Sequence, residues 1–125
     1  MPKFLSDEFF GELQNALAAD PKWTETTSGV KTTILLGVTD TGSNFMISVD
    51  GGATKIQKTE KGSAAEFSFE GTYDAWTKVA KGELDMQSAV LKGQLKFKGS
   101  ITKILMYRDR FMRIADVLKG LPKDY

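Results

Sequence analysis

Hydrophobic residues alternate with polar ones across the middle of the chain, and this pattern constrains the fold more than any other feature. A period of two places successive side chains on opposite faces of a strand, so each run predicts a strand with one buried face. Runs over residues 30–38 and 45–50 are joined by Asp40-Thr41-Gly42-Ser43, which predicts a hairpin turn. A short, weak strand over 54–58 and a clear strand over 65–70 follow.

Helical patterns lie before and after this region. Ser6 can cap a helix whose apolar residues share one face and which ends at Asp20-Pro21. Residues 22–29 are polar and are predicted to form a loop. After the strands, Thr72 and Asp85 can each cap a further helix with apolar residues at spacings of three and four.

The last part of the chain returns to a strand and then to a helix. Gly93-Gln94-Leu95-Lys96-Phe97-Lys98-Gly99 predicts a strand that is apolar on one face only. Ser100 then begins one long or kinked helix, whose apolar stripe is broad and which closes at Gly120 and Pro122. The pattern predicts an α+β fold: a single domain over residues 1–125 with a five-stranded, mostly antiparallel sheet and helices packed on one face.

The chain contains no cysteine and no histidine. This excludes thiol nucleophiles, zinc sites of the usual ligands and Ser-His or Cys-His catalysis. We therefore expect no catalytic residue, metal or cofactor, and a protein that is not an enzyme. No run approaches the ~20 apolar residues of a membrane span, and the first residues lack a secretory signal, so we expect a cytoplasmic protein.

Charge is unevenly distributed along the sequence. Residues 1–91 hold 8 basic and 13 acidic side chains, whereas residues 92–125 hold 9 basic and 3 acidic ones. One interpretation is a pair of solvated faces; the other is transient contact with an anionic membrane surface or a phosphate-bearing ligand. The candidate cations for such contact are Lys103, Arg108, Arg110 and Arg113.

Two short motifs have both a structural and a chemical interpretation. Asp40-Thr41-Gly42-Ser43 is similar to the aspartic protease signature, whose chemistry needs two carboxylates and hence a dimer of this chain. The residue before it, Thr39, is polar where that family has an apolar one, so a turn is favoured. Lys96-Phe97-Lys98 interleaves basic and aromatic residues, but Phe97 is expected to face inward, which argues against nucleic-acid binding.

Large apolar residues remain in surplus after this assignment. They fill either a dense core or the wall of a ligand cavity, and periodicity does not separate these two alternatives.

The segment from Lys81 to Tyr107 resembles the sterol carrier protein 2 (SCP2) family. The resemblance rests on Gly82, on the helix start Asp85-Met86-Gln87-Ser88-Ala89, and on the Gly93–Gly99 strand leading through Ser100 into an apolar helix. Its strong part covers residues 72–118. Met86 stands where that family often has proline, and the chain ends without a peroxisomal tripeptide, which fits a stand-alone prokaryotic-type member.

The resemblance implies an apolar tunnel between the sheet and the helices that binds or carries a lipid such as a fatty acid, a fatty acyl-CoA or a sterol. An alternative is an accessory domain for an enzyme acting on lipophilic substrates. The final helix is the expected lid. The expected lipid-binding residues are Ile34, Leu36, Phe45, Ile47, Phe67, Phe69, Trp76, Met86, Val90, Phe97, Ile104, Leu105, Phe111 and Met112.

Overall fold

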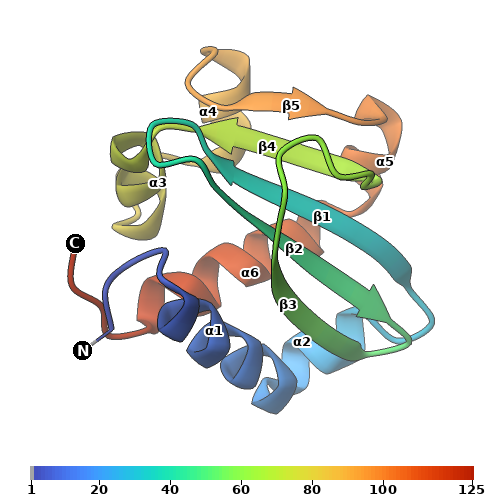
Figure 1. Ribbon diagram of the computed structural model, residues 1–125. Coiled ribbons are helices and arrows are strands. Elements are labelled where there is room, and N and C mark those ends of the chain that lie inside the picture. The colour runs from blue at the N-terminus through green and yellow to red at the C-terminus, as the bar shows by residue number, and fades with distance from the viewer. Residues whose placement is uncertain (1) are drawn as a thin grey trace.

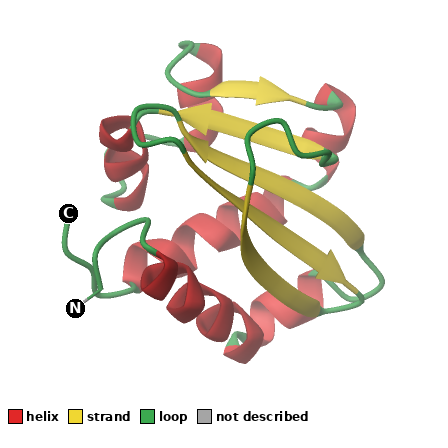
Figure 2. Cartoon of the chain, viewed as in Figure 1, coloured by secondary structure: helices red, strands yellow, loops and turns green. Residues whose placement is uncertain are grey.

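A five-stranded sheet organises the computed structural model, which describes residues 2–125 (Figures 1 and 2). Its strands follow the spatial order β3-β2-β1-β4-β5. Only the β1–β4 pair is parallel, and the other three pairs are antiparallel. The α+β class and the mostly antiparallel sheet are confirmed. The strands are β1 (Lys31–Val38), β2 (Ser43–Asp50), β3 (Ala53–Thr59), β4 (Phe67–Gly71) and β5 (Lys96–Lys98).

Along the chain, helices come before β1, between β4 and β5, and after β5. Their bounds are α1 (Asp7–Ala19), α2 (Pro21–Thr26), α3 (Tyr73–Ala80), α4 (Met86–Leu91), α5 (Ile101–Met106) and α6 (Arg108–Gly120). The four caps expected from the sequence are all present, since each side chain accepts a backbone N–H of the first turn. These caps are Ser6, Thr72, Asp85 and Ser100.

The structure corrects one expectation about helices and decides between the alternatives of another. The loop expected over residues 22–29 begins as α2, because Asp20 ends α1 and also caps the next helix, with Pro21 at its first position. The final helical region, expected as one long or kinked helix, is interrupted at Tyr107 and forms α5 and α6. The Tyr107 ring packs edge-on against Phe67 with centroids 5.7 Å apart, which fixes the chain where α5 turns away from α6.

The core lies on one face of the sheet. Residues with even numbers in β1, such as Ile34 and Leu36, are buried in the same cluster as residues of α1, α3 and α6. At the β2 side, the rings of Phe10 in α1 and Phe45 are stacked with centroids 3.9 Å apart. In Figure 1, α6 passes behind the sheet, and α1 and α2 lie below it. The helices therefore cover one face, as expected.

The opposite face is crossed by residues 60–66, which connect β3 to β4 (Figure 1). The connection must cross because β4 pairs with β1 rather than with β3. Leu35, which points to this face, is only 2% exposed yet lies outside the main core cluster. Because residues 60–66 cover this face, a ligand site would form on the helical face of the sheet.

Candidate functional site

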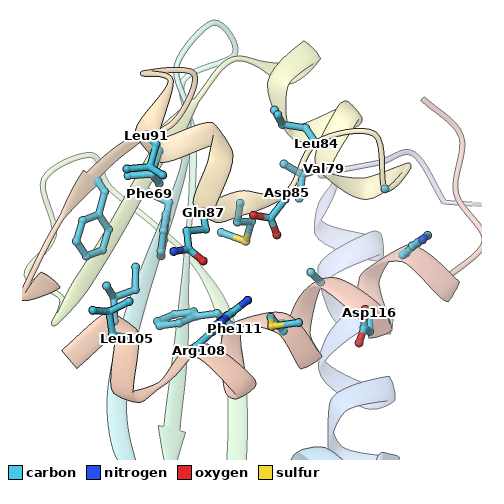
Figure 3. A pocket seen from close by; sticks show the side chains of 18 of the residues that line it. Phe69, Val79, Leu84, Asp85, Gln87, Leu91, Leu105, Arg108, Phe111 and Asp116 are labelled. Atoms are coloured by element: carbon cyan, nitrogen blue, oxygen red, sulfur yellow. The ribbon is translucent and has the colours of Figure 1, made fainter. Parts of the chain in front are cut away.

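A cavity of about 320 Å³ lies between the edge of the sheet and the second half of the chain. Its floor is formed by Phe69 of β4 and Phe97 of β5, which face the same side because they are register partners. The cavity opens to solvent beside α4 and α5, where Leu91 is 81% exposed and Leu105 58% exposed. Figure 3 shows the labelled side chains arranged around this space.

Every helix from α3 to α6 contributes apolar side chains to the wall. α4 supplies Met86 and Val90, whose spacing of four places them on one face of the helix. α6 supplies Phe111, Met112 and Ala115 by the same spacing rule. Further apolar wall residues are Val79, Leu84, Ile101 and Ile104.

A second, smaller cavity of about 30 Å³ lies deeper in the core. It shares Phe69, Val79, Met86, Phe111 and Ala115 with the first cavity. Its remaining walls are Ile34, Leu36, Ile47, Trp76, Ile114 and Leu118. The two spaces are therefore neighbours that are separated by shared side chains.

Few polar groups line the main cavity. Asp85 is occupied as the cap of α4, where its carboxylate accepts the backbone N–H of Ser88 at 3.1 Å. Figure 3 shows the Gln87 amide and the Arg108 guanidinium pointing into the cavity from α4 and α6. Asp116 and Lys119 complete the polar part of the lining. A ligand would thus meet a mostly hydrocarbon wall with a few polar groups.

The four cations expected to contact an anionic surface have different environments. Lys103 pairs with Glu66 at 2.9 Å, and Arg113 pairs with Asp20 at 2.6 Å. Arg110 donates from Nε to the Thr26 carbonyl at 2.8 Å and stacks over Tyr107. Among residues 2–125, Arg108 alone of the four has no ion pair or hydrogen bond from its side chain.

One carboxylate fastens α5 to the sheet. Glu66, just before β4, accepts the Thr32 hydroxyl hydrogen at 2.5 Å and the Lys103 ammonium at 2.9 Å. These hydrogen bonds hold the pKa of Glu66 below its ordinary value, and Glu66 in turn raises the pKa of Lys103. Gly99 has φ of +142° between β5 and α5, and a Cβ there would lie 2.9 Å from the Glu66 carbonyl oxygen.

The structure brings most of the expected lipid-binding residues to the two cavities. Eight of them line the main cavity: Phe69, Met86, Val90, Phe97, Ile104, Leu105, Phe111 and Met112. Four others, Ile34, Leu36, Ile47 and Trp76, line the small one. Phe45 and Phe67 line neither, because Phe45 packs on α1 and Phe67 packs behind Phe97 and Phe111.

Several lining residues were not expected from the sequence. Leu91 and Ile101 belong to the opening, and periodicity gives no sign that such exposed apolar residues face a cavity. Arg108 was expected to contact an anionic membrane surface or ligand, but the sequence did not predict that it lines the cavity. Gln87 and Ala115 also line the cavity, and nothing in their spacing distinguishes them from ordinary helix positions.

The Asp40 motif forms part of a turn, as favoured above. Asp40 lies between β1 and β2, and its carboxylate accepts the backbone N–H of Tyr73 at 2.9 Å. Within the part of the chain that the structure describes, no group of three acidic or other ligating side chains could hold a metal ion. No helix among the same residues is long and apolar enough to cross a bilayer.

Comparison with known proteins agrees with this geometry. The SCP-2 sterol transfer family model matches residues 11–111. A crystal structure of sterol carrier protein 2 matches with a TM-score of 0.84 and 19% identity, covering 96% of this chain and 100% of that chain. No curated protein sequence matches.

Two solution structures are also similar. One is a conserved hypothetical protein from Thermus thermophilus, described as possibly sterol carrier protein, with a TM-score of 0.81, 17% identity and coverage of 99% and 93%. The other is palmitated SCP2L2 from Aedes aegypti, with a TM-score of 0.58, 14% identity and coverage of 97% and 100%. Because the family match spans most of the sequence, the chain belongs to the SCP-2 sterol transfer family.

Proposed function

We propose that this protein binds and carries a lipid with a long acyl chain, without chemical conversion, in the cavity between the sheet edge and α4, α5 and α6. The observation that carries the proposal is an open cavity of about 320 Å³ with a mostly apolar lining. Family membership supports lipid binding in general, and the palmitated Aedes aegypti relative supports a fatty acyl ligand.

The affinity would come from hydrocarbon burial. Each methylene removed from water contributes roughly 0.8 kcal/mol, so ten methylenes supply roughly 8 kcal/mol, which corresponds to a dissociation constant near micromolar before ordering costs. Met86 and Met112 suit such a wall because flexible thioether side chains adapt to ligands of different shape. No specific polar contact is required along the chain.

Arg108 and Gln87 would give the ligand an orientation. Arg108 has no charged partner among the described residues and points into the cavity beside Gln87 (Figure 3). A carboxylate or other anionic head group would be bound there, with the acyl chain directed inward. The end of a longer chain would reach the small cavity by displacing Met86 and Phe111, which line both spaces.

A variant that fills the cavity tests the proposal. Ala115 is half-buried and lines both cavities, so Ala115→Phe places a ring where the acyl chain would lie. In a titration with a fluorescent fatty acid, we expect saturable binding by the natural protein and at least a tenfold loss in the variant. Native mass spectrometry of freshly purified protein should also show a co-purified lipid.

The matched control is Ala18→Phe, which makes the same change at an exposed position of α1. It should bind the fatty acid as the natural protein does. Circular dichroism checks that both variants are folded. Absence of saturable binding by the natural protein, or equal binding by the filled variant, would refute the proposal. The accessory-domain alternative stays a prediction; it gains support only if a specific enzyme co-purifies.

A further inference from the structure

Exposed apolar side chains gather around the cavity opening. Among the described residues, six large hydrophobic side chains are exposed, and four of them lie between positions 91 and 108. They are Leu91, Ile101, Leu105 and Met106, at 81%, 64%, 58% and 68% exposure. The first three line the cavity, so they border one opening rather than being scattered over the surface. A grouped apolar patch of this kind marks an interaction surface.

Positive charge is concentrated in the same segment of the chain. Residues 91–108 contain five basic side chains and no acidic one. Of the five, Lys103 is paired with Glu66, and Lys96 stands opposite Glu70 in the sheet register. Lys92, Lys98 and Arg108 have no ion pair within residues 2–125. Lys98 alternates with Phe97, so it projects from the other face of the edge strand β5. The patch therefore combines apolar side chains with unneutralised positive charge.

We propose that this surface, the opening rim formed by Leu91, Ile101, Leu105, Met106 and their basic neighbours Lys92, Lys98 and Arg108, docks on an anionic lipid bilayer. Basic side chains are attracted to anionic head groups, while exposed apolar side chains enter the boundary between head groups and acyl chains. The choice of a bilayer over a protein partner rests on the proposed function, because a lipid could then pass between bilayer and cavity without crossing water.

The rest of the molecule supports this orientation. α1 presents Asp7, Glu8 and Glu12 to solvent, so its outer face is acidic and would be repelled by the same bilayer. In Figure 1, α4, β5 and α5 lie at one end of the molecule and α1 at the other. The acidic outer face of α1 would thus face away from the docked surface.

Vesicle sedimentation tests the proposal. Vesicles of phosphatidylcholine alone are compared with an equimolar mixture of phosphatidylcholine and phosphatidylserine, in about 0.1 M salt, where the Debye length is about 10 Å. We expect binding to the mixed vesicles only. Lys92→Gln with Lys98→Gln should weaken it by roughly fivefold per charge removed. Met106→Ser, which does not alter the cavity lining, should weaken it as well.

The matched control is Lys55→Gln with Lys58→Gln, the same charge change on exposed positions of β3. It should leave vesicle binding within twofold of the natural protein. Equal binding to both vesicle types, no binding to either, or an equal loss in the control would overturn the proposal. So would gel filtration in which Met106→Ser turns a dimer into a monomer, since the rim would then be covered by a second copy.

Fatty-acid titration without vesicles separates the two proposals. The Lys92, Lys98 and Met106 variants should bind the fluorescent fatty acid normally. Vesicle binding without fatty-acid binding would refute the carrier proposal alone, and the reverse result would refute the docking surface alone.

Discussion

Three arginines lie near the start of α6, and each has a different environment. Arg110 stacks over Tyr107, and Arg113 is paired with Asp20. Arg108 lines the cavity instead. The sequence could place all three on one helix, but it could not predict their different partners. Asp20, the partner of Arg113, lies more than ninety positions away in the sequence and comes close only in the folded chain. Arg108, which has no partner among the described residues, is therefore the arginine that can contact a ligand.

Replacing Arg108 with glutamine should weaken binding of fatty acids but not of fatty alcohols of the same length. The expected loss for the acid is about fivefold, since an exposed charge interaction contributes about 1 kcal/mol. Displacement of a fluorescent probe by the acid and the alcohol measures both affinities in the same variant. A parallel loss for the alcohol would indicate a damaged cavity rather than a lost charge contact.

Glu66 should make stability depend on pH. Hydrogen bonds from Thr32 and Lys103 hold its pKa below the ordinary value of 4.5 in the folded protein. A depressed pKa means that the folded state favours the carboxylate, so the stabilisation is present above about pH 4.5 and is lost as pH falls through the folded pKa. Glu66→Gln should therefore be less stable than the natural protein at pH 7, by at most about 1 kcal/mol.

Urea unfolding of the two proteins at pH 7 and near pH 3 tests this dependence. All other carboxylates are common to both, so the difference between them isolates Glu66. The difference should shrink at the lower pH. A difference that stays constant with pH would show that the side chain acts through packing alone.

At the scale of elements, the sequence predicts best where a cap and a regular period coincide. Ser6, Thr72, Asp85 and Ser100 each begin a helix as expected. α2 was missed because Trp23 is its one large apolar residue, so it shows no apolar period, although Asp20-Pro21 is itself a start signal. The break at Tyr107 was not localised, because the spacing of apolar residues continues across it.

The cavity was predictable only in part for the same reason. Periodicity identifies which side chains point inward, and twelve of the fourteen expected residues line one of the two spaces. Periodicity cannot tell which inward side chains pack against another side chain and which face an empty space. Phe45 is covered by Phe10, whereas Phe97 faces open space, and their local patterns are alike.

α5 should be the most loosely held helix of the cavity wall. It has no buried residue, and its polar anchor to the sheet is the Lys103–Glu66 pair. Local opening is easiest where few apolar contacts would be lost. In hydrogen exchange, we expect the α5 amides to exchange at least tenfold faster than those in the middle of α1, which buries four side chains.

Addition of a long-chain fatty acid should slow exchange in α5, because Ile104 and Leu105 line the cavity and would contact the ligand. Exchange in α1 serves as the internal control and should not change. Equal protection of α5 and α1 in the ligand-free protein would show that α5 is a fixed wall.

At the scale of the whole molecule, burial divides the chain into two parts. The first half forms most of the sheet and packs it against α1, with buried rings such as Phe9 and Phe10. The second half forms the cavity wall and leaves apolar side chains exposed around it. A stable half therefore supports a half that is incompletely packed in the ligand-free protein. Filling the cavity should consequently stabilise the entire fold.

Thermal unfolding measures this coupling directly. A ligand that binds only the folded state stabilises it by about 2.7 kcal/mol at one hundred times its dissociation constant. For a domain of this size, that corresponds to a rise in Tm of roughly 10 °C. We expect palmitic acid to give such a rise and butanoic acid to give none, because a short chain buries too little hydrocarbon to bind. The Ala115→Phe variant should show no rise with either acid. An equal rise in that variant would place the fatty acid on the surface of the protein instead of in the cavity.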